Sequence, residues 1–167
     1  MNLSRLRSGE IAAAIGGFIL LLALFAFNWY DYGSLLFGQR GGGAWDSAGF
    51  FGVIANLIIL AAALVAIVLP LMAATSGAPA LPVATSAVTA AFGIAAIVMV
   101  LGRMLMQPGS NEQVDLDFGI FLALVGAILV AYGGWQSMQE DGTTFAEARA
   151  QLGARFGSRR LPPRDRP

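Results

Sequence analysis

Apolar residues gather along this 167-residue chain in four long runs, and the breaks between the runs hold most of its glycine, proline and charge. The first run covers 11–27, and no ionisable residue occurs between Ser47 and Gly102. That second stretch is long enough for two crossings, and 75–82 marks the turn between them because it contains one Gly and two Pro, which break helices. The pattern predicts membrane spans at about 11–28, 50–72, 83–102 and 118–138.

The lengths of these runs are typical of membrane-spanning helices. A helix rises about 1.5 Å per residue, so roughly 20 apolar residues cross the hydrocarbon core of a bilayer. The first run is longer than the apolar region of a signal peptide and continues into aromatic residues, so it is predicted to be a retained span. Pro70 predicts a kink or an early end of the second helix. The predicted fold class is all-α, a transmembrane four-helix bundle with a short cytoplasmic tail.

Composition favours a membrane protein and removes most enzyme chemistries. Hydrophobic residues make up 57% of the chain and charged residues 12%, and the mean hydropathy is +0.70. Soluble domains contain about 25% charged residues. The chain contains no Cys and no His, which excludes disulfides, thiol nucleophiles and the commonest metal ligand. We therefore expect no enzyme activity, no cofactor, no metal ion and no nucleic acid as a partner.

The arginines predict the orientation of the chain in the membrane. All ten basic residues are Arg, of which two precede the first span and six follow the fourth. Only Arg40 and Arg103 lie near the other side. Because short translocated loops are poor in basic residues, both termini are predicted to be cytoplasmic, in a multi-pass protein of the cell (plasma) membrane.

Two domains are predicted, a four-span transmembrane domain at 1–139 and a cytoplasmic basic tail at 140–167. Residues 144–147 match a capping box, and apolar residues follow at helical spacing, which favours a short amphipathic helix on the inner leaflet. Two glycines weaken that helix, so a mostly disordered tail stays open as the alternative. Beyond Ser158 the tail is predicted to be disordered.

Polar side chains inside the predicted spans need a partner or a purpose, because hydrocarbon forms no hydrogen bonds. The candidates for an intramembrane polar site are Asn56, Thr85, Ser86 and Thr89. Each hydroxyl can bond back to the carbonyl four residues earlier, and Asn56 can make an interhelical hydrogen bond. Helix packing and a solute site therefore both remain open for these residues.

Charged residues flank the loop between the third and fourth spans. Arg103 lies at the outer end of the third span, and Asp115 and Asp117 lie where the fourth begins. An interfacial ion pair across this loop is predicted. Asp117 is also expected to favour the start of the fourth helix through the positive end of the helix dipole.

Small residues form the clearest pattern within the spans. Those of the fourth span lie on one helix face and include Gly119, Ala123, Gly126 and Gly133. Small side chains let another helix approach closely, so this face is predicted to pack tightly against a helix of the same chain or of a second chain.

The first outer loop, 28–49, is the segment that suggests recognition. Its candidate residues are Trp29, Tyr30, Asp31, Trp45 and Asp46. Trp and Tyr are also expected at helix ends in any membrane protein, where they form an aromatic belt. The loop is therefore interpreted either as such a belt or as an exposed recognition surface.

Four short motifs at the ends of the spans carry a family resemblance. They are Asn28-Trp29-Tyr30, Ala44-Trp45-Asp46, Leu81-Pro82-Val83 and Gly133-Gly134-Trp135-Gln136-Ser137-Met138. Together they resemble uncharacterised small four-span integral membrane proteins of actinobacterial type, over roughly residues 3–140. The resemblance implies four helices with both ends inside and implies no known activity.

Two functional hypotheses follow from these features. The first is a structural or accessory helix bundle, with the lipid bilayer as its surroundings and a homo-oligomer or another envelope membrane protein as its partner. The alternative is an oligomeric transporter or channel for a small solute, motivated by Asn56 and the hydroxyl cluster of the third span. Four spans from one chain rarely enclose an aqueous path, so this alternative requires an oligomer.

Overall fold

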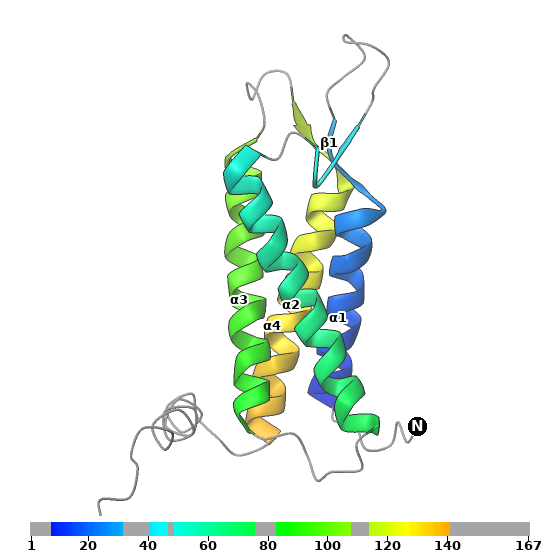
Figure 1. The fold of residues 1–167 in the computed structure, drawn as a ribbon, viewed down its shortest axis with the longest axis vertical. Coiled ribbons are helices and arrows are strands. Elements are labelled where there is room, and N and C mark those ends of the chain that lie inside the picture. Colours follow the sequence, from blue (N-terminus) through cyan, green and yellow to red (C-terminus); the bar gives the residue numbers. More distant parts are fainter. Residues whose placement is uncertain (1–7, 32–40, 47–48, 76–82, 108–113, 141–167) are drawn as a thin grey trace, which may run out of the picture.

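A computed structural model describes residues 8–31, 41–46, 49–75, 83–107 and 114–140 (Figure 1). Its helices are α1 (Ser8–Phe25), α2 (Gly49–Thr75), α3 (Val83–Leu105) and α4 (Phe118–Glu140). All four are long and apolar enough to cross a membrane. The predicted fold class, an all-α transmembrane four-helix bundle, is confirmed for this part of the chain. The predicted tail at 140–167 lies outside the described residues except for Glu140.

The four helices run side by side as one bundle (Figure 1), in which α1 and α3 each contact both α2 and α4. The α1–α4 contact is the most extensive, so the first and last helices lie side by side. Ser8 Oγ donates a hydrogen bond of 2.6 Å to Glu140 Oε1, and Gln136 Nε2 donates one of 2.8 Å to Ser8 Oγ. The start of α1 and the end of α4 therefore meet at one end of the bundle, which we call the terminal end.

Small residues bring the backbones of α1 and α4 into direct contact. A Cβ atom placed on Gly16 would lie 2.7 Å from the carbonyl oxygen of Gly126, and one on Gly133 would lie 2.5 Å from the backbone nitrogen of Ala13. No real side chain fits at such distances. On the small-residue face predicted on α4, Gly126 and Gly133 therefore pack against α1 of the same chain, and Gly119 packs against Asn28 of the segment that follows α1.

Most helix ends differ from the predicted spans by one to three residues, and two of these differences have a clear physical cause. The first helix ends at Phe25, where a span to residue 28 was predicted, because Asn28 already belongs to a strand. The second helix continues through Pro70 to Thr75, so an early end at this proline is wrong. Pro70 only removes one backbone donor, and packing against neighbouring helices keeps such interruptions tolerable in membrane helices.

A small antiparallel sheet lies at the end of the bundle opposite the terminal end, and we call it the cap (Figure 1). It comprises β1 (Asn28–Asp31), β2 (Gly42–Gly43) and β3 (Asp115–Leu116), in the order β2-β1-β3. No strand is predicted from the sequence at these positions. The strands are only two to four residues long, so they show no alternation of apolar and polar residues.

Candidate functional site

The most unusual side chain within the helices is Arg103, in the last turn of α3, which is only 3% exposed. Its Nη2 donates a hydrogen bond of 2.8 Å to the carbonyl oxygen of Ala44. The same oxygen accepts a 2.7 Å hydrogen bond from Asn56 Nδ2 on α2, whose side chain is fully buried. A carbonyl oxygen has two lone pairs, so one acceptor binds α2 and α3 to the segment that follows β2.

Two buried aromatic rings from β1 complete the surroundings of this cation. The guanidinium carbon of Arg103 lies 5.7 Å from the centroid of Trp29 and 5.4 Å from that of Tyr30. Both rings are fully buried. Their negative faces attract a cation, and desolvation makes this attraction stronger, about 2 kcal/mol or more per contact. The rings therefore offset part of the cost of burying a charge.

Hydrogen bonds hold the two rings in place. Tyr30 donates from its hydroxyl to the carbonyl of Arg103 at 3.1 Å, and Trp29 donates from Nε1 to the carbonyl of Ala23 at 2.6 Å. Ala23 lies in the last turn of α1, where carbonyls have no partner within the helix. Each ring thus joins the cap to the end of a different helix. We call Arg103, Asn56, Trp29, Tyr30 and the Ala44 carbonyl the latch.

The latch fixes a tight turn whose tip is exposed. Asp46 Oδ2 accepts a hydrogen bond of 2.6 Å from the backbone nitrogen of Gly43, and the Asp46 nitrogen donates to the Gly43 carbonyl at 3.2 Å. Trp45 lies between them in sequence, is 37% exposed, and stacks on Phe25 with ring centroids 6.0 Å apart. Trp45 and Asp46 are therefore presented at the surface from a turn that is bound to the bundle.

The five candidate recognition residues of the first outer loop fall into two groups. Trp45 and Asp46 are exposed, as is Asp31. The expectation that Trp29 and Tyr30 are exposed is wrong, because both are fully buried in the latch. Their apolar bodies are buried while their polar tips find backbone carbonyls, which is the usual condition for burying Trp and Tyr.

The residues predicted as one intramembrane polar site lie at opposite ends of the bundle. Asn56 belongs to the latch, whereas Thr85, Ser86 and Thr89 lie in the first two turns of α3, at the terminal end. Thr89 Oγ1 donates to the carbonyl of Thr85 at 3.0 Å, which is the back-bonding expected of a hydroxyl four residues on.

The acidic residues predicted to pair with Arg103 take part in the backbone structure of the cap. Asp115 is exposed and pairs with Asp31 across the sheet. Asp117 Oδ1 accepts a hydrogen bond of 2.6 Å from the Phe118 nitrogen at the start of α4. Asp117 thus contributes to the start of α4 through a direct hydrogen bond. The ion pair with Arg103 stays a prediction.

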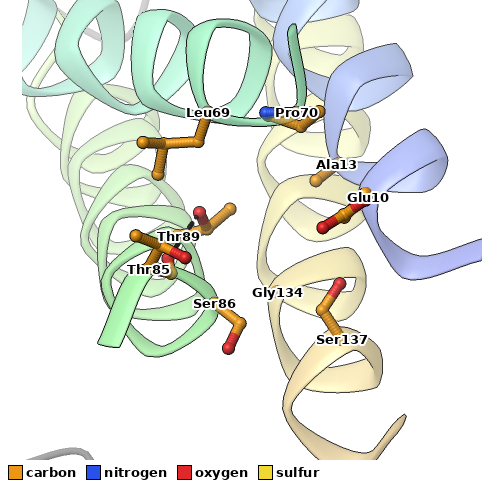
Figure 2. Close-up of a pocket in the computed structure, with 9 residues that line it drawn as sticks. All are labelled: Glu10, Ala13, Leu69, Pro70, Thr85, Ser86, Thr89, Gly134 and Ser137. Carbon is orange, nitrogen blue, oxygen red and sulfur yellow. Dashed lines mark hydrogen bonds between the residues drawn. The ribbon is translucent and has the colours of Figure 1, made fainter. Parts of the chain in front are cut away.

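A small cavity of about 20 Å³ lies at the terminal end (Figure 2). All four helices contribute to its walls, with Glu10 from α1, Pro70 from α2, Thr89 from α3 and Ser137 from α4 among its lining residues. Glu10 is half-buried. Glu10 and the α3 hydroxyls are far apart in sequence, so the sequence gives no sign that they line one cavity.

No protein-family model, no curated protein and no solved structure matches this chain. The resemblance to actinobacterial four-span proteins therefore stays a prediction. Within the described ranges, no group of three or more acidic residues is arranged to hold a metal ion. The latch, the cap and the terminal cavity are therefore the features of the described residues that bear on function.

Proposed function

We propose that this integral membrane protein is a structural or accessory helix bundle that presents its cap to a second copy or to another envelope membrane protein. The latch is the observation that carries this proposal. A buried cation and a buried amide both donate to the Ala44 carbonyl, next to the exposed Trp45 and Asp46. Burying a cation and an amide costs free energy. We infer from this cost that a fixed position of the turn with Trp45 and Asp46 is important for function.

The packing of the helices also favours an accessory role over a conduit. The α1 and α4 backbones meet at Gly16 and Gly126, and those of α3 and α4 meet at Gly93 and Ala131. Asn56, which motivated the transporter hypothesis, is fully buried with its amide on a carbonyl. The terminal cavity, at about 20 Å³, has room for roughly one water molecule.

A photo-crosslinker at the cap tests the proposal directly. We expect p-benzoylphenylalanine in place of Trp45, in native membranes, to give one discrete protein adduct, because an aromatic replacement keeps the stacking on Phe25. The matched control is the same replacement at Ile128, which is 50% exposed and lies midway along α4, in an apolar groove between α3 and α4. This control should give only lipid adducts, detected by mass spectrometry.

Protein adducts that are equally diffuse at both positions would contradict an interface at the cap. The transporter or channel remains the second candidate, and the hydroxyl-lined terminal cavity is the observation that favours it. Its signature is solute flux in liposomes containing the purified protein, reduced in a variant of the cavity such as Thr89→Val. Flux of that kind would overturn the accessory role.

We further propose the plasma membrane as the location, with the terminal end facing the cytoplasm. The contact between Ser8 and Glu140 supports both ends of the transmembrane domain lying on one side, and the arginine distribution supports the cytoplasmic side. A periplasmic-active phosphatase fused before Ser8 or after Glu140 should be inactive at both sites. Activity at either fusion site would contradict this orientation.

A further inference from the structure

The polar side chains that line the terminal cavity all carry oxygen atoms. The polar side chains on its walls are Glu10, Thr85, Ser86, Thr89 and Ser137, and every polar atom among them is an oxygen. Its other lining residues are Ala13, Leu69, Pro70 and Gly134. Figure 2 shows the carboxylate of Glu10 pointing from α1 toward the hydroxyl-bearing residues of α3 on the opposite wall.

The charge of the lining side chains and the volume of the cavity restrict which ligand can bind. Hard cations prefer carboxylate and hydroxyl oxygens, and among the residues that the structure describes, none that lines the cavity carries a positive charge. One carboxylate balances one positive charge, whereas Ca²⁺ usually takes six to eight oxygens, often including several carboxylates, and Mg²⁺ gives up its water reluctantly. A cavity of about 20 Å³ holds a single particle of the size of a water molecule.

We propose that the terminal cavity is a binding site for one small monovalent cation, Na⁺ or K⁺, with the Glu10 carboxylate as its counter-charge and the α3 and α4 hydroxyls as further oxygen ligands. The site joins all four helices at the end where the chain enters and leaves the bundle. A bound ion therefore links α1 to α3 and α4, while Leu69 and Pro70 of α2 cover it with apolar side chains. This inference is independent of the accessory role, because neither the latch nor the cap contributes to the cavity.

Thermal unfolding of the purified protein in detergent tests the site. Measurements in NaCl, KCl and choline chloride at equal ionic strength separate binding of a small cation from screening. We expect the Tm to be about 3–6 °C higher in NaCl or KCl than in choline chloride when the ion is at ten times its Kd. The salt that gives the larger rise identifies the ion.

Glu10→Gln should abolish this rise, because the amide has nearly the same shape and no charge. The matched control is Glu140→Gln, an exposed carboxylate at the same end of the bundle that does not line the cavity, and it should keep the full response. If Glu10→Gln does not fold, Thr89→Val removes one hydroxyl at constant shape and should raise the half-saturating ion concentration about tenfold.

Three results would overturn the site. One is an equal Tm in all three chlorides. Another is an unchanged ion response in both Glu10→Gln and Thr89→Val. The third is an equal loss of response in Glu10→Gln and Glu140→Gln, which would assign the effect to general surface charge at the terminal end.

Discussion

Arg103→Ala should lower the free energy of unfolding by about 3 kcal/mol. The substitution removes a charged hydrogen bond to the Ala44 carbonyl, which contributes about 1.5–3 kcal/mol, and two cation–π contacts with buried rings. It also leaves a cavity beneath Trp29 and Tyr30. Relief from burying a charge offsets part of this loss. Unfolding in denaturant or heat, followed by Trp fluorescence in detergent, measures the change.

Two further substitutions separate the charge of Arg103 from its volume. Arg103→Lys keeps a cation near the rings but lacks the planar fork, so it should recover only part of the lost stability. Arg103→Met keeps much of the volume without charge and should cost less than Ala, because it leaves a smaller cavity beneath the two rings. We nevertheless expect Arg103→Met to loosen the turn at Trp45, seen as faster amide exchange in the cap.

Glu140→Ala serves as the matched loss of an exposed charge. It removes the exposed hydrogen bonds from Ser8 and Gln136 and should lower stability by about 1 kcal/mol or less. A similarly small effect of Arg103→Ala would contradict the latch. It would mean that the guanidinium contributes no more than a solvated surface charge does.

Gly133→Ala should destabilise the bundle by about 1–3 kcal/mol although it adds a single methyl group. The new Cβ would lie 2.5 Å from both the backbone nitrogen of Ala13 and the carbonyl oxygen of Gly9. Backbone atoms of α1 cannot move aside as a flexible side chain can, so α1 and α4 must separate. Thermal unfolding in detergent measures the loss.

Gly102→Ala is the matched control, since it makes the same change within a helix of the same bundle. Its Cβ would come 3.3 Å from Cζ of Phe51, the far end of a side chain that can rotate. Ala has a higher helix propensity than Gly by up to about 1 kcal/mol, so this variant should be neutral or more stable. Equal destabilisation by both substitutions would show that α1 and α4 are not in close backbone contact at Gly133.

The close contact between the glycines of α1 and α4 also limits what assembly experiments can show. Gly16 and Gly126 face each other inside one chain, so enlarging either residue disturbs folding before it disturbs any contact between chains. Loss of oligomers in such a variant is therefore no evidence for an interface at α4. Exposed positions at the cap, such as Trp45, test association without entering the core.

The pattern of apolar runs by itself determined the number of spans, the pairing of the two ends on one side and the presence of a closely packed small-residue face on the fourth helix. These properties depend on composition over about 20 residues or on helical spacing, and both are local. The back-bonding of Thr89 and the contribution of Asp117 to the start of α4 were predictable for the same reason.

Only the tertiary structure decided which groups meet. Arg103 and Ala44 are 59 positions apart, and the carbonyl that binds the arginine carries no sequence signal, since every residue has one. Trp29 and Tyr30 looked like belt residues because local sequence does not report what covers an aromatic ring. Glu10 and Thr89 share a cavity only because helices 1 and 3 converge on it. Contacts between distant segments arise from helix packing, because the helices that pack against a given face decide which residues it contacts.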